Sequence, residues 1–250
     1  MDLKLNDKVA LITGSSRGLG LASARALVEE GCRVAICARG ESRLQEVAEL
    51  LRQESERERV LSVVSDLSVA AGVSTVVRRT IETFGRLDIL VNNARVEFGK
   101  PFVDVTEVEW AALMDFNVKS MFLCCQAVGR QMLAQGVGRI VNIGSGLAVR
   151  GLSNSAVACA GQGAIHQLTS ALALEWARYN IRVNAIGAGW VTSEPSAESP
   201  EQELLARYIP SRRKGHPSDL CGLLVYLASD ACDFVTGQMM CIDGGATSHA

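Results

Sequence analysis

The stretch TGSSRGLG, residues 13–20, decides the fold because it stands between a strand pattern and a helix pattern. The residues before it, KVALIT (8–13), are apolar and β-branched, as in a strand that is buried on both faces. The residues after it, over about 17–30, have the apolar spacing of an amphipathic helix. A glycine-rich turn between a first strand and a first helix is typical of a dinucleotide-binding βαβ unit.

The glycines of this turn have distinct physical roles. Gly14 permits the tight turn, while Gly18 and Gly20 allow the backbone to approach a pyrophosphate and the helix to pack on the sheet. The helix would then present free N–H groups to the phosphates. A glycine turn that binds nothing is the alternative. We predict that the cofactor-binding residues of the turn are Gly14, Ser16, Arg17, Gly18, Leu19 and Gly20.

The same alternation of strand and helix continues along the chain. Further strand-like runs are RVAICA (33–38), VLSVVS (60–65), LDILVN (87–92), GRIVNIG (138–144), IRVNAIG (181–187) and MMCID (239–243). Helical patterns lie between them, at about 42–56, 69–84, 106–135, 155–178 and 218–228. Such alternation produces right-handed crossovers and a parallel sheet. We predict one α/β domain over residues 1–250, a Rossmann-like doubly wound parallel sheet of about seven strands with helices on both faces.

Length and composition exclude several other classes. The 250 residues are 48% hydrophobic, which suits one domain with a large core. A net charge of −2 gives no electrostatic argument for nucleic acid or an anionic membrane surface. The N-terminal residues lack a signal-peptide pattern, and no apolar run of about 18 residues favours a membrane span. The eight cysteines form no CxxC pair, so we expect reduced thiols and no metal site in a cytoplasmic protein.

The choice of cofactor should depend on the residue that follows the second strand. An acidic residue there would bind the 2′-hydroxyl of NAD, whereas Arg39 suits the 2′-phosphate of NADP. Arg17 could reach the same phosphate, although both arginines could equally be solvated. Asp66 could accept a hydrogen bond from the adenine amine, or cap the helix that starts near Val69. We therefore predict NADP(H) in preference to NAD(H).

These motifs together resemble the short-chain dehydrogenase/reductase family over nearly the whole chain. The resemblance rests on TGSSRGLG (13–20), Asp66-Leu67, NNA (92–94), Asn117 in FNVKSMF, IVNIGS (140–145) and IDGG (242–245). Within the family, the chain is most similar to NADP-dependent 3-oxoacyl-carrier-protein reductases and small-carbonyl reductases. The resemblance implies a carbonyl or alcohol substrate and four further cofactor-binding residues, Leu67, Asn93, Gln162 and Thr192.

The family's chemistry uses an Asn, a Ser, a Tyr and a Lys. Asn117 and Ser145 match the first two, but the positions of the Tyr and Lys hold Ala158 and Gln162. In the family, a Lys⁺ near the Tyr stabilises its phenolate, because a free phenol has a pKa of about 10. Ala158 has no proton to give, and Gln162 can hydrogen-bond a ribose hydroxyl but carries no charge. The resemblance therefore implies impaired or altered hydride transfer.

Two further departures lie near the nicotinamide end of the family pattern. The usual NNAG turn ends in Arg95, and the usual PG after the sixth strand reads Ala188-Gly189. Since the adenine half of the pattern is intact, we expect nucleotide affinity to survive while hydride chemistry is weakened or redirected. Five residues could replace the missing proton donor, but none of them alone is a strong candidate. They are Arg95, Cys159, His166, Tyr208 and His216.

Segment 192–216 is polar and contains three prolines, which predicts a lid over the substrate or an extra helix pair. Four apolar residues are expected near the rim of the substrate pocket: Val149, Leu152, Trp190 and Val191. They favour a small hydrophobic carbonyl compound as the substrate. The resemblance also implies a homodimer or homotetramer that pairs the long helices at about 106–135 and 155–178.

Three functions remain open on the sequence. The first is an NADP(H)-dependent short-chain reductase with an inefficient or altered reaction. The second is a non-catalytic protein that holds a nucleotide or a partner subunit. The third is an ordinary reductase in which drift or deliberate change placed Ala158 and Gln162 where Tyr and Lys stood.

Overall fold

The computed structural model describes residues 3–94, 96–192 and 206–248, and the structural statements that follow concern these residues. Its strands form one parallel seven-stranded sheet, as predicted, and their order is β3-β2-β1-β4-β5-β6-β7. The strands are β1 (Val9–Thr13), β2 (Arg33–Ala38), β3 (Val60–Val64), β4 (Ile89–Asn92), β5 (Gly138–Ser145), β6 (Ile181–Ala188) and β7 (Met239–Ile242).

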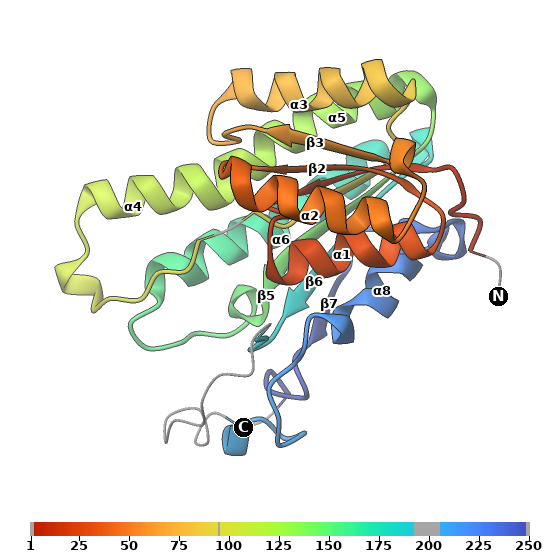
Figure 1. Cartoon of the computed structure of the whole chain (residues 1–250). Coiled ribbons are helices and arrows are strands. Elements are labelled where there is room, and N and C mark those ends of the chain that lie inside the picture. Colours follow the sequence, from red (N-terminus) through yellow and green to blue (C-terminus); the bar gives the residue numbers. More distant parts are fainter. Residues whose placement is uncertain (1–2, 95, 193–205, 249–250) are drawn as a thin grey trace.

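Helices cover both faces of this sheet (Figure 1). One core cluster joins the sheet to α1, α2 and α8, and the other joins it to α3, α5 and α6. Central strands are buried on both faces, which explains why their sequences are nearly all apolar. The helices are α1 (Gly18–Glu29), α2 (Glu41–Gln53), α3 (Ala70–Phe84), α4 (Glu107–Met114), α5 (Ser120–Gln135), α6 (Ala156–Trp176) and α8 (Ser218–Ala228).

The strand order reverses between β1 and β4. From β1 the chain builds outward through β2 to β3, then crosses back to place β4 on the other side of β1. Helices on either side of such a switch point leave a crevice at the carboxyl ends of the strands, where doubly wound proteins bind ligands. The topology therefore places the candidate site beyond Thr13 and Asn92.

The prediction of a single helix over about 106–135 is wrong in one respect. A π-helical segment, Asp115–Lys119, separates α4 from α5 and contains Asn117. The Asn117 side chain bonds the backbone of Val96, donating from Nδ2 to the carbonyl at 2.9 Å and accepting from the N–H at 2.8 Å. The Ser120 hydroxyl also donates to the Phe116 carbonyl. Such π-turns often occur at functional sites, and here the turn holds Asn117 facing the loop after β4.

The two ends of the predicted lid are hydrogen-bonded to each other just after β6. Residues 193–205 lie outside the described residues, so the lid prediction is not tested there. Thr192 donates its N–H to the Gly215 carbonyl at 3.0 Å, and Gly215 donates to the Trp190 carbonyl at 2.9 Å. No helix within the described ranges is long and apolar enough to cross a membrane.

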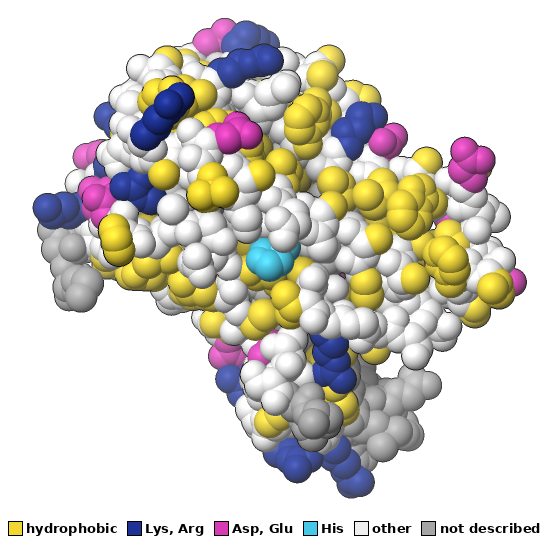
Figure 2. Space-filling model, turned by 180° about the vertical axis from the view of Figure 1, so that it is seen from behind, with side chains coloured by type: hydrophobic (Ala, Val, Ile, Leu, Met, Phe, Trp, Pro, Cys, Tyr) yellow, Lys and Arg dark blue, Asp and Glu magenta, His cyan; other side chains and the backbone are white. Residues whose placement is uncertain are grey.

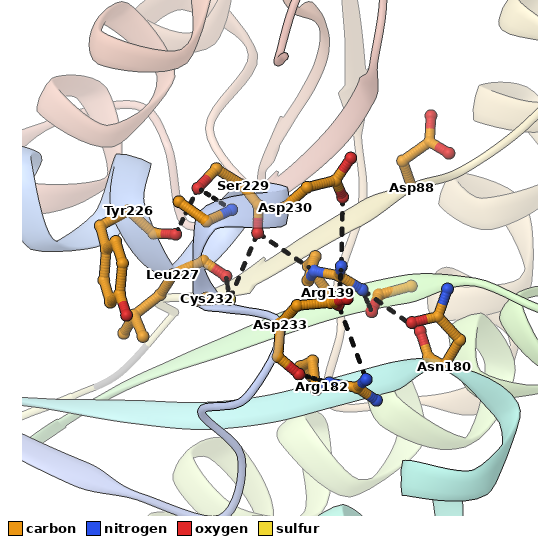
Figure 3. A network of polar contacts seen from close by, with 12 residues as sticks. Asp88, Arg139, Asn180, Arg182, Tyr226, Leu227, Ser229, Asp230, Cys232 and Asp233 are labelled. Atoms are coloured by element: carbon orange, nitrogen blue, oxygen red, sulfur yellow. Dashed lines mark hydrogen bonds and ion pairs between the residues drawn. The ribbon is translucent and has the colours of Figure 1, made fainter. Parts of the chain in front are cut away.

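A buried arginine ties the C-terminal segment to the opposite end of the sheet (Figure 3). Arg139, on β5, is only 4% exposed, and its guanidinium donates to the carbonyls of Ser229, Gly138 and Asn180. Its Nη2 forms ion pairs with Asp230 at 3.1 Å and Asp233 at 2.8 Å. One side chain therefore serves five acceptors from three segments of the chain, away from the candidate site.

Replacing Arg139 with Met is expected to lower the free energy of unfolding by about 3 kcal/mol, because buried carbonyls would lose a charged donor. Urea unfolding of the two proteins measures this difference. Arg78→Met is the matched control, since Arg78 forms an exposed pair with Glu82 on α3 and should change stability by under about 0.5 kcal/mol. Equal losses in the two variants would contradict the assignment.

Candidate cofactor and substrate site

The glycine turn has the geometry that the sequence predicts. Gly14 and Gly18 have φ of 62° and 54°, in the left-handed region that favours glycine. Gly20 has no room for a side chain: a Cβ there would lie 2.4 Å from the Gly14 carbonyl oxygen and 2.5 Å from the Asn93 Nδ2. The first turn of α1 therefore packs directly on the loop, with its N-terminus at the carboxyl end of β1.

Asn93 fastens this turn to the neighbouring strand. Its Nδ2 donates to the carbonyls of Thr13, at 3.1 Å, and Gly14, at 3.0 Å. The Thr13 hydroxyl in turn accepts the N–H groups of Asn93, at 2.9 Å, and Ala94, at 3.1 Å. The loops after β1 and β4 thus form one hydrogen-bonded unit at the switch point.

A cavity of about 1000 Å³ opens over this unit. Most of the predicted cofactor-binding residues line it: Gly14, Ser16, Arg17, Gly18, Leu19, Arg39, Leu67 and Asn93. Gly20 lies behind the lining, in the packed turn, and Asp66 is not among the lining residues. The cavity's size and position at a helix N-terminus suit a dinucleotide.

Three arginines give one end of this cavity a positive charge. Arg17, Arg39 and Arg43 all line it, and the Arg39 guanidinium lies 4.6 Å from the centre of the Phe116 ring. The sequence analysis missed Arg43, although its place one turn after Arg39, in the first turns of α2, was a usable signal. Burial raises the pKa of Cys37, which also lines the cavity, to about 12, so this thiol stays protonated.

Asp66 bonds its own loop rather than the helix that follows. Its Oδ1 accepts the N–H of Ser68 at 2.9 Å, and hydrogen bonds from Ser68 lower the pKa of Asp66. The alternative role as a helix cap is wrong, because α3 begins at Ala70 after Val69, with no side-chain cap. The adenine contact stays a prediction.

A second cavity, of about 650 Å³, adjoins the first, and Glu97 and Val191 line both. All four residues predicted at the catalytic positions line it: Asn117, Ser145, Ala158 and Gln162. Thr192, predicted to bind the cofactor, lines this cavity as well. The structure thus brings together residues from the π-turn, the end of β5 and the start of α6.

Gln162, which lines this cavity, has a buried polar atom without a partner in the described part of the chain. The residue is 6% exposed, and its Oε1 has no hydrogen-bond partner among the described residues. A buried acceptor without a partner costs about 1–3 kcal/mol, so a donor from a bound ligand would stabilise it. A ribose hydroxyl is such a donor. The glycine turn at Gly14 and Gly18, which lines the first cavity, and the Gln162 side chain, which lines the second, fit a nicotinamide dinucleotide that spans both.

Four of the five weak candidates for a replacement proton donor are not among the residues that line the cavity. Within the described residues, Cys159, His166, Tyr208 and His216 are not among those that line it, and Arg95 lies outside these residues. The Cys159 thiol instead donates to the Arg150 carbonyl at 3.8 Å. His166 is half-buried in α6, and the His216 Nδ1 lies 2.8 Å from the Ser218 hydroxyl.

The lining also contains ionisable residues that the sequence analysis missed: Glu97, Arg150, Lys214 and Asp243. Burial acts to raise the pKa of Asp243, but hydrogen bonds from Thr247, Gly245 and Ala246 outweigh it, and the pKa is lowered. Ala188 is buried and lines the cavity, as do Leu152, Trp190 and Val191. Val149 is 60% exposed and is not among the lining residues. In the described ranges, no group of three or more His, Cys, Asp or Glu is placed to hold a metal ion.

A parallel doubly wound sheet with a glycine-rich turn and adjoining cavities at its switch point defines a dinucleotide-binding protein of the Rossmann class. Residues 14–247 match a family model described as Enoyl-(Acyl carrier protein) reductase. The chain belongs to the short-chain dehydrogenase/reductase family.

Several relatives match along almost their whole length. The chain is 33% identical over 249 residues to an NAD-dependent glycerol dehydrogenase of Listeria innocua (98% of this chain, 96% of the relative). It is 33% identical over 244 residues to a 3-oxoacyl-[acyl-carrier-protein] reductase of Synechocystis (96% and 97%). Its structure is similar to a gluconate 5-dehydrogenase from Burkholderia cenocepacia in complex with NADP and tartrate, with a TM-score of 0.93 and 35% identity over 100% and 98% of the chains.

Replacing Gly20 with Ala is expected to lower the free energy of unfolding by about 2 kcal/mol, because the new methyl group would overlap the Gly14 carbonyl. Chemical unfolding of the apo protein measures the change. Gly222→Ala in α8 is the control: its Cβ would meet nothing within 4 Å, and we expect a gain of up to about 1 kcal/mol. A neutral Gly20→Ala would show that the turn can open.

Proposed function

We propose that this protein binds NADP(H) and interconverts a small carbonyl and an alcohol, with hydride transfer that is impaired or altered. The observation that carries the proposal is the shared cavity of Asn117, Ser145, Ala158 and Gln162. In the family to which the chain belongs, the last two positions would hold a tyrosine and a lysine. A methyl group and a neutral amide there provide no proton and no charge.

Each remaining side chain of the set has a definite task under this proposal. Ser145 can hydrogen-bond the substrate oxygen, and its Oγ already accepts the Leu147 N–H at 3.3 Å. Asn117 positions the loop at Val96, between the two cavities, rather than exchanging protons. Gln162, which lines the cavity, would hydrogen-bond a ribose hydroxyl with its amide. When bound, the nicotinamide supplies or accepts the hydride.

The loss of the acid–base pair determines how much slower the reaction is expected to be. A positioned general acid typically contributes about 10²–10⁴ in rate. Ser145 can polarise a carbonyl but does not protonate it usefully, because a hydroxyl is a poor acid near neutral pH. Substrate and cofactor would therefore still meet in the right geometry, while proton transfer would depend on water or on another group.

NADP(H) is favoured by charge at the adenosine end of the first cavity. Arg17, Arg39 and Arg43 line it there, and the residue after β2 is an arginine rather than an acid. Guanidinium groups bind phosphate through charge-assisted, often paired hydrogen bonds. The similar structure that contains NADP supports this preference, while the NAD-dependent relative shows that both cofactors occur among similar proteins.

Apolar surface supports assembly into a homodimer or homotetramer, which is part of the proposal. Hydrophobic side chains gather on the part of the molecule that carries α4 (Figure 2). Val103 and Val108 are 91% and 78% exposed, and Leu174 on α6 is 85% exposed. Contiguous apolar surface of this kind marks protein interfaces. All eight cysteines are free, which fits the reducing conditions of a cytoplasmic location.

A non-catalytic nucleotide-binding protein is the second candidate. The favouring observation is that the cofactor cavity keeps its glycine turn and arginines, while Ala158 and Gln162 leave the neighbouring cavity without the family's acid–base pair. Calorimetric NADPH binding without measurable turnover on any carbonyl would select this candidate. Absence of NADPH binding would remove both.

The double variant Ala158→Tyr, Gln162→Lys is expected to reduce carbonyl compounds about 10²–10⁴-fold faster than the unchanged protein, because it supplies a proton donor and its cationic partner. NADPH oxidation with a panel of ketones and 3-oxoacyl thioesters measures the rates. Ala158→Tyr alone is the control, and should recover less because its phenol keeps a high pKa. Turnover of about 10 s⁻¹ by the unchanged protein, a typical enzyme value, would contradict the proposal.

Arg39→Asp is expected to weaken NADPH binding about 10–100-fold and to leave NADH binding equal or stronger, since only NADPH carries the 2′-phosphate. Calorimetric titration with each nucleotide gives both affinities. Arg79→Asp, at an exposed position of α3 that lines neither cavity, is the control for the change in charge. An equal loss of affinity for NADPH and NADH would mean that Arg39 does not bind the 2′-phosphate.

A further inference from the structure

We propose that the second cavity takes a substrate that carries a carboxylate, and that Arg150 is the residue that anchors it. This inference rests on the proposed function, because it treats that cavity as the substrate site. It departs from the hydrophobic carbonyl that the sequence favours. Arg150 follows the short helical turn Gly146–Ala148 after β5, so it lies on the same segment as Ser145 and lines the same cavity.

The guanidinium of Arg150 is held in place by neutral groups. Its Nη1 donates to the Ala246 carbonyl at 2.6 Å, and its Cζ lies 5.1 Å from the centre of the Tyr208 ring. The Tyr208 ring in turn packs edge-on against Trp190, with centroids 5.7 Å apart. Three segments of the chain thus fix the orientation of this cation.

The donors that remain on Arg150 have no acidic partner among the described residues. In the described part of the chain, Arg150 forms no ion pair, and its only hydrogen bond from the guanidinium goes to Ala246. An arginine presents five N–H donors in a planar fork that matches a carboxylate. A half-buried, oriented guanidinium with free donors beside a cavity is therefore a ready site for that group.

The other charges of the cavity agree with this assignment. Asp243 directs its carboxylate to its own turn, accepting the N–H groups of Gly245 at 2.9 Å and Thr247 at 2.7 Å. Glu97 lines both cavities and so lies on the side of the cofactor. Lys214, half-buried, adds a second cation to the lining near Thr192. Arg150 and Lys214 are thus two cations of the lining, and the Asp243 carboxylate accepts backbone N–H groups rather than a guanidinium donor.

The test compares two six-carbon polyols that differ in one end group, sodium D-gluconate and D-sorbitol. Each is titrated calorimetrically into the full protein in the presence of saturating NADP⁺, after NADP⁺ binding itself has been measured. We expect gluconate to bind about 10–100-fold more tightly than sorbitol, the range for hydrogen bonds to a charged group. Arg150→Met should remove this preference and leave sorbitol affinity unchanged.

Three further variants make the result specific. Arg150→Lys should keep part of the preference, and Arg79→Met, on α3, should keep all of it. Arg150→Gln retains a donor toward Ala246 and replaces Arg150→Met if the latter does not fold. Equal binding of the two polyols, or a preference that survives loss of Arg150, would overturn the anchor while leaving NADP⁺ binding intact. Failure to bind NADP⁺ would instead count against the proposed function.

Discussion

The packing of Gly20 against the Gly14 carbonyl and the Asn93 amide is the constraint on which the candidate site depends. No side chain fits between α1 and this loop, so the helix must begin directly at the carboxyl end of β1. Asn93 then binds the carbonyls of Thr13 and Gly14, which joins β1 to β4 where the strand order reverses. Because α1 starts here, its free N–H groups face the cofactor cavity rather than solvent.

The second cavity lies at the same edge of the sheet, but other segments form it. The end of β5 supplies Ser145, the segment after β6 supplies Trp190, and α6 supplies Ala158 and Gln162. Asn117 reaches this edge only because a π-turn interrupts the long helix and presents the amide to the backbone of Val96. The helix gives up regular hydrogen bonding there and gains a fixed connection to the loop between the two cavities.

The strands and the glycine turn could be predicted because each has a pattern in a short stretch of sequence. Strands buried on both faces show as short apolar runs, and the glycine turn shows by its place between a strand and a helix. The π-turn could not be predicted, since α4 and α5 together have ordinary helical spacing and the interruption depends on a tertiary bond from Asn117. Arg150 and Lys214 were missed because no local pattern separates a cavity cation from a solvated one.

The two cavities differ in which charged residues line them and where those charges lie. In the first, Arg17, Arg39 and Arg43 line the cavity together with a glycine turn, whose backbone N–H groups need no titrating side chain to bind a phosphate. In the second, position 162 holds a neutral amide, and Arg150 and Lys214 are cations of the lining. A cation beside the reacting oxygen promotes proton transfer, whereas a cation away from it binds and orients an anion. Under the proposed function, the electrostatics of this chain would therefore favour binding its ligands over exchanging protons with them.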